Sequence, residues 1–342
     1  MNNYHNKTVF ITGGGGCVGR AVVRRFLANN WNVTNLAHPE EIATLPFGID
    51  ENVQIVQGEL NSLLPDQIPE NAFVVHLAGK VHTIPKSKDD VDDFFRVNRD
   101  GTVNLAKCAL QRDTLGFLFV STSAVYGDKL MQGICTEETE PLPNSVYGQS
   151  KFEAEQQLQS LWPTSCPLII LRPSVMFGPG DRGNFLKLFK MSKRGFVPVV
   201  YGGKTQKNIL YVQDIANIIE FAASQPDLFY ERIYNVAYSK PYSFRELIFD
   251  ISKVTSRRVI PLPIPKAMLL PPAFFCDLIG TLCRCELPIS KRKLRILGQN
   301  VVMSTNRLKK VIEQHILLHS FEEGLKDYIG TGTSLWDYKG RG

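Results

Sequence analysis

The segment Thr8-Val-Phe-Ile-Thr-Gly-Gly-Gly-Gly-Cys-Val-Gly19 decides the fold of this 342-residue chain. Its first five residues form a short apolar run typical of a buried strand, and Gly13, Gly16 and Gly19 follow where a helix is expected to begin. Glycines at these positions allow a tight turn, a close approach of the backbone to a pyrophosphate, and close packing of helix on strand. The helix N-terminus attracts negative charge. The segment therefore predicts a dinucleotide-binding site.

Short apolar runs and helix-length segments alternate after this unit. Runs that are apolar throughout, without alternation, are typical of strands buried on both faces of a parallel sheet. We predict strands at 8–12, 32–36, 53–56, 73–77, 117–120 and 168–171, and helices at about 17–29, 91–112 and 147–161. Repeated strand-helix-strand order indicates an α/β fold, a Rossmann-type doubly wound parallel sheet with right-handed crossovers.

The composition of the sequence changes after Pro173. Glycine and proline punctuate the chain at 178–180, at 202–203 and in the proline-rich stretch 260–265. We predict a dinucleotide-binding domain at 1–173 and a smaller C-terminal α/β substrate lobe at 174–342, with the chain able to cross between them. The active site is expected in a cleft at the carboxyl ends of the strands.

The charge distribution is modest, with a formal net charge of +6. The exception is a basic cluster, which is interpreted as a solvated helix face, with an anionic ligand or a membrane surface as the lesser alternative. Its members are Lys291, Arg292, Lys293 and Arg295. Nothing in this pattern indicates a nucleic-acid partner.

Seven cysteines without regular spacing favour reduced thiols in a cytoplasmic protein over a disulfide framework. No metal site is predicted. The apolar run at 9–11 is too short for a signal-peptide core. The apolar stretch 267–282 is interrupted by Pro271, Pro272 and Asp277, so it does not indicate a transmembrane segment. It is expected to line a pocket or touch a lipid surface.

The pair Tyr147 and Lys151 carries the expected chemistry, in the sequence Tyr147-Gly-Gln-Ser-Lys151. Residues four apart share one face of a helix, and a nearby cation favours the phenolate, so a tyrosine could exchange protons near neutral pH. A chance pair on an exposed helix is the alternative. The run Ser121-Thr122-Ser123 follows a predicted strand and offers hydroxyls for a substrate oxygen.

The end of the second predicted strand usually decides between NAD and NADP, because an acid there binds the adenosine ribose. This chain has Ala37 and then His38, so the usual acid is missing and a slight preference for NADP is predicted. Glu59, after the third strand, is either a contact of the adenine amine or a solvated side chain.

Several motifs together identify a family resemblance. They are the glycine loop, Val75-His-Leu-Ala-Gly79, Val97-Asn98 with Gly101-Thr102, Ser121-Thr-Ser-Ala-Val-Tyr-Gly127, Tyr147 to Lys151, Leu171-Arg-Pro173 and Tyr211-Val-Gln-Asp214. In this order they resemble the extended short-chain dehydrogenase/reductase superfamily, which includes the NAD-dependent epimerase/dehydratase family. The resemblance covers nearly the whole chain.

The resemblance implies roles for individual residues. Thr122 would bind the substrate oxygen, Tyr147 would act as general acid and base, and Lys151 would hold the nicotinamide ribose and lower the tyrosine pKa. Asn98 would stabilise the loop beneath the cofactor, or cap a helix. Asp214 is expected to cap the following helix. The residues expected to contact cofactor are Gly13, Gly16, Cys17, Val18, Gly19, His38, Glu59, Leu60, Leu77, Ala78, Gly79, Asn98, Tyr147, Lys151 and Pro173.

Differences between this sequence and the patterns of the family's branches indicate which branch the chain resembles. Dehydratases carry an Asp-Glu pair after the catalytic hydroxyl, where this chain has Ser123 and Ala124, so a 4,6-dehydratase is not expected. The chain resembles bacterial nucleotide-sugar 4-epimerases and 4-keto reductases, with a UDP-sugar as the expected substrate. The residues expected to contact it are Lys80, Ser123, Asn184 and Lys207, the last where epimerases often carry an arginine.

Two other functions stay open at this point. One is a dehydrogenase or reductase of a lipid-like substrate, similar to the 3β-hydroxysteroid and β-keto-acid branch, which the apolar stretch 267–282 favours. The other is a non-catalytic NAD(P)-binding protein. Within the sugar branch, the missing adenosine anchor slightly favours net 4-keto reduction over epimerisation. The resemblance also implies a homodimer through the long helices after Val91 and Tyr147.

Overall fold

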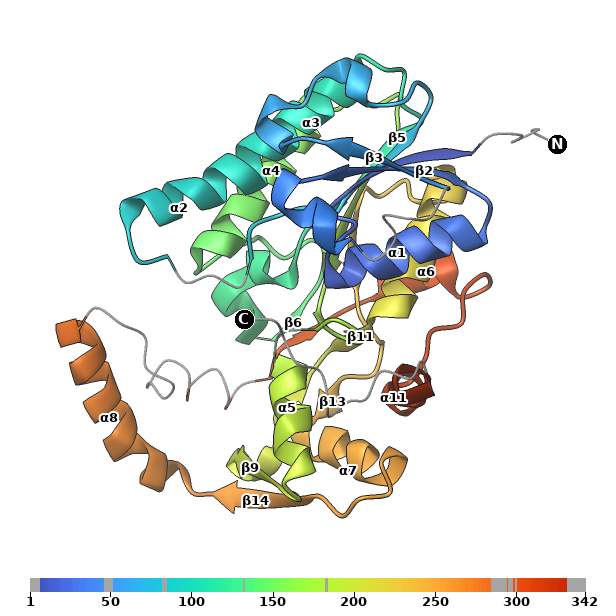
Figure 1. Cartoon of the computed structure of the whole chain (residues 1–342). Coiled ribbons are helices and arrows are strands. Elements are labelled where there is room, and N and C mark those ends of the chain that lie inside the picture. The colour runs from blue at the N-terminus through green and yellow to red at the C-terminus, as the bar shows by residue number, and fades with distance from the viewer. Residues whose placement is uncertain are drawn as a thin grey trace.

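A computed structural model shows two layers of helices on a parallel sheet, with a smaller group of elements beside it (Figure 1). The structure describes residues 7–45, 52–81, 85–131, 133–181, 184–283, 294, 298 and 300–330. The basic cluster of Lys291, Arg292, Lys293 and Arg295 lies outside the described residues, and the side chain of Asn184 is likewise not described.

The main sheet has seven strands in the order β12-β7-β5-β4-β1-β2-β3, and every neighbouring pair is parallel. Each predicted strand is present, and β12 is an addition at one edge. The strands are β1 (Thr8–Thr12), β2 (Asn32–Ala37), β3 (Val53–Gln57), β4 (Phe73–His76), β5 (Gly116–Val120), β7 (Leu168–Pro173) and β12 (Ile233–Val236). The order reverses beside β1, so its carboxyl end is a topological switch point.

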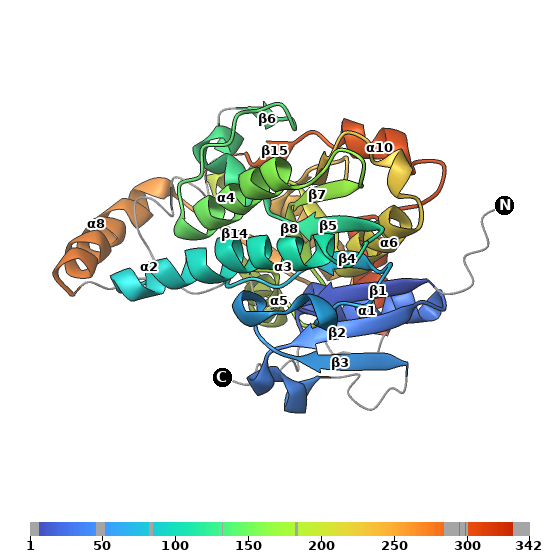
Figure 2. The ribbon, with the colours of Figure 1, turned by 90° about the horizontal axis from the view of Figure 1, so that it is seen from above.

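Alternate residues of the strands supply two hydrophobic cores, one on each face of the sheet. On β1, Val9 and Ile11 face one core and Phe10 faces the other. The first core is covered by α1 (Cys17–Ala28) and α6 (Val212–Ser224). The second is covered by α3 (Gly101–Leu110) and α4 (Val146–Leu161). Figure 2 shows the sheet between the two helical layers.

The predicted helix at 91–112 is longer at its start and contains an irregular turn. Helix α2 (Lys88–Phe95) begins at Lys88 because the Ser87 hydroxyl accepts a hydrogen bond from the Asp90 amide at 3.1 Å. A single π-helical turn, Arg96–Asp100, then connects α2 to α3. Such turns are frequent at functional sites, and this one carries the buried side chain of Asn98.

The remaining elements are short strand pairs and helices. The parallel pairs are β8 (Val175–Phe177) with β11 (Ile209–Tyr211), β9 (Phe196–Val200) with β14 (Ile260–Ile264), and β6 (Ile134–Cys135) with β15 (Val302–Met303). Strands β10 (Gln206–Lys207) and β13 (Tyr242–Ser243) pair antiparallel. The helices are α5 (Asn184–Lys193), α7 (Phe244–Val254), α8 (Lys266–Cys283), α10 (Asn306–Ile312) and α11 (Phe321–Gly330).

The chain crosses between these elements and the main sheet. After β8 and α5, it returns to pack α6 against α1 and to add β12 to the sheet edge. The division into domains at 173 and 174 stays a prediction. Among the described residues, none of the helices is long and apolar enough to cross a bilayer. The cysteines whose side chains are described, Cys17, Cys108, Cys135, Cys166 and Cys276, are free thiols.

The turn between β1 and α1 depends on glycine at two positions. Gly13 has a φ of +76°, which side chains rarely adopt, and a Cβ there would lie 2.6 Å from the Ala78 amide nitrogen. A Cβ on Gly19 would lie 2.1 Å from the Gly13 carbonyl oxygen. The helix can therefore pack on the turn only without a side chain at 19.

We predict that Gly19→Ala destabilises the fold by about 1–3 kcal/mol, because the new methyl group forces backbone atoms of the turn apart. The measurement is the melting temperature by circular dichroism. Gly133→Ala is the matched control, since a Cβ at Gly133 meets nothing within 4 Å. Equal melting temperatures for the two variants would contradict this account of the turn.

Candidate active site

The start of α1 forms a cradle for a phosphate group. Gly16 precedes the helix and has no side chain to cap it, and the first turn contains no acidic residue. No side chain caps the start of α1, and such a helix N-terminus suits an anionic ligand. Cys17 donates a hydrogen bond from Sγ to the Pro179 carbonyl at 3.3 Å, and Val18 packs on the core. These features fit a pyrophosphate.

A chain of hydrogen bonds fixes the strand ends beside this cradle. The Thr102 hydroxyl donates to the Asn98 carbonyl at 2.7 Å, so its oxygen accepts from His76 Nε2 at 2.8 Å. The other ring nitrogen, Nδ1, then accepts from the Thr12 hydroxyl at 2.6 Å. Burial, with the charge of Lys151, holds the pKa of His76 well below its usual range. His76 is therefore a neutral bridge between β1, β4 and α3.

Asn98 connects the loop after β4 to the helix that carries the predicted catalytic pair. Its amide nitrogen donates to the Lys80 carbonyl at 3.1 Å and to the Ser150 hydroxyl at 2.9 Å, while its oxygen accepts from the Lys80 amide at 2.7 Å. The Ser150 hydroxyl donates to the Tyr147 carbonyl at 3.0 Å. The prediction that Asn98 stabilises this loop has a direct structural basis, and the alternative of a helix cap does not.

The side chains of Thr122, Tyr147 and Lys151 gather at the carboxyl end of β5. Tyr147 and Lys151 lie on α4, which begins where the Ser145 hydroxyl accepts from the Gly148 amide at 3.1 Å. Burial raises the pKa of Tyr147 to about 12, and hydrogen bonding with the Thr122 side chain acts in the opposite direction. The Tyr147 phenol and the Thr122 hydroxyl are thus adjacent.

Lys151 is almost fully buried, with 3% of its surface exposed. Its ammonium lies 3.9 Å from the centroid of the Phe119 ring, and a Cβ on Gly79 would lie 3.8 Å from Nζ. Burial lowers the pKa of Lys151 to about 7, although the carboxylate of Glu155 acts in the opposite direction. The ammonium is therefore placed where a ligand above Gly79 could reach it.

In the chain alone the pKa of Tyr147 is shifted upward, and the lowering of that pKa by Lys151 stays a prediction. The charge of Lys151 is not among the causes that shift the pKa of Tyr147, whose net shift is upward. The spacing in the helix places both side chains on one face, but the lysine extends over Phe119. A phenolate at neutral pH would need further positive charge or hydrogen-bond donors beside Tyr147.

A buried ion pair lies behind Lys151 on the same helix. Arg172 donates from Nη2 to Glu155 Oε2 at 2.5 Å and from Nε to both carboxylate oxygens at 3.1 Å. The Ser121 hydroxyl, beside Thr122, also donates to Glu155. Arg172 Nη1 reaches the Tyr126 hydroxyl at 3.0 Å. The sequence analysis missed Glu155, although its position four residues after Lys151 places it on the same helical face.

The adenosine end of the predicted site contains a pair of exposed side chains. His38 Nε2 lies 3.4 Å from Glu59 Oε1, so the residues after β2 and β3 face each other. Ala37 is buried, which leaves His38 as the first exposed side chain after β2. Leu60 packs on the second core below them. Pro173 lies at the buried carboxyl end of β7, on the other side of β1 from these residues.

The residues predicted to contact the substrate do not all lie together in one site. The ammonium of Lys80 binds Asp93 Oδ2 on α2 at 2.7 Å, so it is already paired. Ser123 is half-buried next to Thr122, and Lys207 is half-buried on β10. Burial lowers the pKa of Lys207, and no acidic group in the described part of the chain is among the causes. The structure describes the backbone of Asn184 as the start of α5.

Asp214 does not cap a helix, which corrects the prediction. It lies in the first turn of α6, but no side chain caps that helix. Its buried carboxylate accepts from the Tyr238 hydroxyl at 2.8 Å and contacts His319 Nδ1 at 2.7 Å. Asp214 therefore joins α6 to the segment that precedes α11.

The described residues contain no cluster of His, Cys, Asp and Glu suited to a metal ion.

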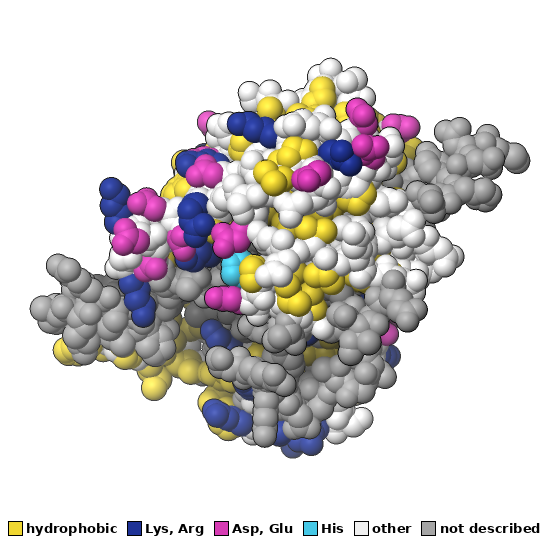
Figure 3. Space-filling model, turned by 45° about the horizontal axis from the view of Figure 1, so that its top comes forward, with side chains coloured by type: hydrophobic (Ala, Val, Ile, Leu, Met, Phe, Trp, Pro, Cys, Tyr) yellow, Lys and Arg dark blue, Asp and Glu magenta, His cyan; other side chains and the backbone are white. Residues whose placement is uncertain are grey.

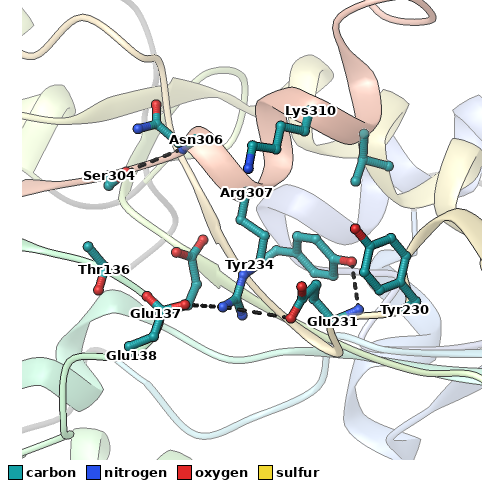
Figure 4. A pocket seen from close by; sticks show the side chains of 11 residues that line it. Thr136, Glu137, Glu138, Tyr230, Glu231, Tyr234, Ser304, Asn306, Arg307 and Lys310 are labelled. Atoms are coloured by element: carbon teal, nitrogen blue, oxygen red, sulfur yellow. Dashed lines mark hydrogen bonds and ion pairs between the residues drawn. The ribbon is translucent and has the colours of Figure 1, made fainter.

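A hollow of about 310 Å³ lies beside the edge strand β12 (Figure 4). Glu137 accepts from the Asn235 amide at 2.9 Å, and Arg307 donates to the Ile233 carbonyl at 2.9 Å. These bonds cover the free backbone groups of the edge. A second hollow, of about 790 Å³, is lined by residues of β6, β10 and β15. Neither is lined by Tyr147 or Lys151, so the candidate site rests on the side-chain arrangement.

Comparison with known proteins identifies the family. Residues 9–237 match the model of the NAD dependent epimerase/dehydratase family. Over 267 residues the chain is 27% identical to the UDP-glucose 4-epimerase of Vibrio cholerae, covering 76% of this chain and 79% of the relative. Over 312 residues it is 25% identical to the N-acetyl-alpha-D-glucosaminyl-diphospho-ditrans,octacis-undecaprenol 4-epimerase of Escherichia coli O157:H7, covering 89% and 85%.

Solved structures show the same fold. The UDP-glucuronic acid 4-epimerase from Bacillus cereus in complex with NAD superposes with a TM-score of 0.72 at 18% identity, covering 95% of this chain and 96% of that one. The chain belongs to the NAD dependent epimerase/dehydratase family. The predictions of a Rossmann-type α/β fold, of the extended short-chain dehydrogenase/reductase superfamily and of an enzyme that uses a nicotinamide dinucleotide are therefore confirmed.

The low pKa of Lys151 predicts a pH-dependent effect on stability. Below about pH 7 the folded protein holds a buried ammonium, which is unfavourable. Between about pH 7 and the ordinary lysine value of 10.5, only the unfolded chain keeps the proton, so stability rises with pH. In nucleotide-free protein, Lys151→Met should raise the melting temperature most below pH 7, and this gain should shrink as the pH approaches 10.5.

Thermal denaturation across this pH range is the measurement. Lys107→Met is the control, because Lys107 is exposed on α3 and its replacement should change the melting temperature equally at each pH. A gain for Lys151→Met that is constant with pH, or that grows as the pH rises, would show that Lys151 is not buried as an ammonium.

Proposed function

We propose that this enzyme transfers a hydride at C4 of a nucleotide sugar, either as a 4-keto reductase or as a 4-epimerase. The observation that carries the proposal is the arrangement of Thr122, Tyr147 and Lys151 beside the uncapped start of α1. A bound nicotinamide dinucleotide supplies or accepts the hydride. The side chains of this chain position the sugar and move its hydroxyl proton.

Each residue has a proposed part in that reaction. The Thr122 hydroxyl, which also accepts from the Ala124 amide at 3.2 Å, orients the C4 oxygen of the sugar. Tyr147 gives a proton to that oxygen on reduction and removes it on oxidation. Lys151 binds the ribose beside the nicotinamide, with its ammonium next to Gly79 of the loop after β4. Asn98 bonds both the loop after β4 and helix α4, so it fixes the positions of these groups relative to one another.

A diphosphate-linked sugar is supported by two observations. Lys207 is a half-buried cation whose pKa burial lowers without an acidic neighbour among the causes, so a phosphate would stabilise its charge. The Vibrio cholerae relative is named a UDP-glucose 4-epimerase, and the Bacillus cereus structure is of a UDP-glucuronic acid 4-epimerase. Ser123 and Ala124 occupy the positions of the dehydratase acid and base, so water elimination is not proposed.

A sugar linked to a lipid is a second candidate substrate, distinct from the 3β-hydroxysteroid-like or β-keto-acid alternative, which stays a prediction. The Escherichia coli relative is named for a sugar joined through a diphosphate to undecaprenol, which is a lipid. That substrate would keep the sugar chemistry of the site and replace the nucleoside. The cytoplasmic location and the homodimer through α2, α3 and α4 stay predictions.

Tyr147→Phe should lower kcat by about 10²- to 10⁴-fold, because the phenol that moves the proton is lost while the ring still packs. Cofactor affinity should change little. The measurement is turnover of UDP-sugars with and without NAD(P)H, by product analysis and by absorbance. Tyr230→Phe is the control, since Tyr230 is 77% exposed beside β12 and outside the proposed site. Undiminished turnover in Tyr147→Phe would refute this mechanism.

The choice of cofactor is proposed to depend on His38 and Glu59. The imidazole of His38 can donate a hydrogen bond to a 2′-phosphate, which supports a slight preference for NADP, whereas the Glu59 carboxylate beside it repels that phosphate. The solved relative from Bacillus cereus is in complex with NAD. The ratio of the dissociation constants of NAD and NADP therefore measures the effect of His38 and Glu59 on cofactor choice.

Two variants should move that ratio in opposite directions. His38→Gln should weaken NADP relative to NAD, and Glu59→Gln should strengthen it, each by roughly two- to fivefold because both side chains are exposed. Isothermal titration with each cofactor gives the ratio. Glu140→Gln, an exposed acid elsewhere, should leave it unchanged. Shifts in the same direction for both variants would place the adenosine ribose away from this pair.

A further inference from the structure

Helix α8 carries ten residues without a charge, 267–276, and most of those whose side chains the structure describes are exposed. Met268 is 68% exposed, Leu270 42% and Phe275 60%. The helix projects from the rest of the molecule at the end remote from the main sheet (Figure 1). Contiguous large apolar side chains at the surface indicate an interaction site.

The strand pair that precedes α8 extends this apolar surface. Strands β9 and β14 run parallel, with Phe196 beside Ile260, so these two side chains share a face. Leu262 lies two residues further on the same face. Phe196 is 50% exposed, Ile260 48% and Leu262 50%. We refer to these three residues, with Met268, Leu270 and Phe275, as the β9–β14–α8 surface.

Exposed cations flank the β9–β14–α8 surface at the start of both strands. Lys190 and Lys193 lie in the last turn of α5, Arg194 follows that helix just before β9, and Arg257 and Arg258 precede β14. Because Phe196 pairs with Ile260, both groups enter the strand pair at the same end. Hydrophobic and basic side chains gather along the lower edge of the view in Figure 3.

The two stretches that form this part of the molecule, 184–204 and 255–276, contain no Asp or Glu. Their basic residues are Lys187, Lys190, Lys193, Arg194, Lys204, Arg257, Arg258 and Lys266. Eight positive charges exceed the net charge of +6 of the whole chain, so the protein's excess of positive charge is concentrated here.

This combination suits one kind of partner. A lipid surface accepts apolar side chains at the boundary of the acyl chains and attracts cations to anionic headgroups. A second copy of the chain in a twofold contact would bring the same cations against one another without acids to pair them. We propose that the β9–β14–α8 surface docks on an anionic lipid bilayer. This proposal does not depend on the substrate proposed above.

Vesicle sedimentation with the full chain tests the docking directly. We expect the protein to sediment with vesicles of phosphatidylglycerol and phosphatidylcholine, to bind phosphatidylcholine alone much more weakly, and to be released by added salt. Equal binding to both vesicles, or binding to neither, would overturn the proposal. No substrate is present, so the outcome is separate from that of the activity assays.

Two double variants examine the two components of the surface. Lys190→Glu with Arg258→Glu should weaken binding to the anionic vesicles by about tenfold or more, through loss of charge attraction. Met268→Ser with Phe275→Ser should weaken it similarly, through loss of apolar contact. The matched control is Arg24→Glu with Lys107→Glu, which reverses exposed charges on α1 and α3 and should bind like the wild type.

Melting temperatures show that each variant is folded, and analytical ultracentrifugation without vesicles reports self-association. If the wild type ignored vesicles but formed a dimer that Met268→Ser with Phe275→Ser dissociated, a second copy would cover the surface and the proposal would be wrong. Weakened vesicle binding in the control variant to the same degree would also overturn it, because attraction would then follow total charge.

Discussion

The bonds of the Asn98 side chain are the constraint on which the candidate site depends. Three hydrogen bonds join the loop after β4 to α4, and the π-helical turn aims the side chain between them. Because Asn98 is fully buried, losing any of these bonds would leave one of its N–H groups or its oxygen without a partner. The positions of Gly79, Tyr147 and Lys151 relative to one another therefore follow from this one amide.

Two buried basic side chains near this amide, Arg172 and Lys151, have different surroundings. Arg172 is neutralised by Glu155 and held by Tyr126, so it stabilises the packing of β7 on α4. Lys151 has an aromatic ring and a glycine as its neighbours, so its charge is costly in the chain alone. A group that is unfavourable without a ligand can contribute more to binding one. Arg172 therefore contributes to stability, whereas Lys151 is proposed to contribute to ligand binding, although both lie on the same side of the sheet.

The fold also separates chemistry from the apolar and basic surface. The catalytic candidates occupy the carboxyl ends of β5 and the start of α4, as expected for an open α/β sheet. The β9–β14–α8 surface belongs to elements that join no strand of the main sheet. Changes in one region can thus be tested without disturbing the packing of the other.

The sequence by itself determined the parts of this protein that depend on local spacing. Continuous apolar runs identified six strands of the main sheet, and the glycine loop and the pair Tyr147 and Lys151 lie on the turn and helix that their spacing indicates. The edge strand β12 escaped notice because Ile-Tyr-Asn-Val is short and mixed in polarity. Only the tertiary structure decided that Lys80 binds Asp93, that Asp214 holds His319, and that the segments of Lys190 and Arg258 enter one strand pair at the same end. Such contacts join residues far apart in the chain, and their energies depend on burial and distance, which no local pattern contains.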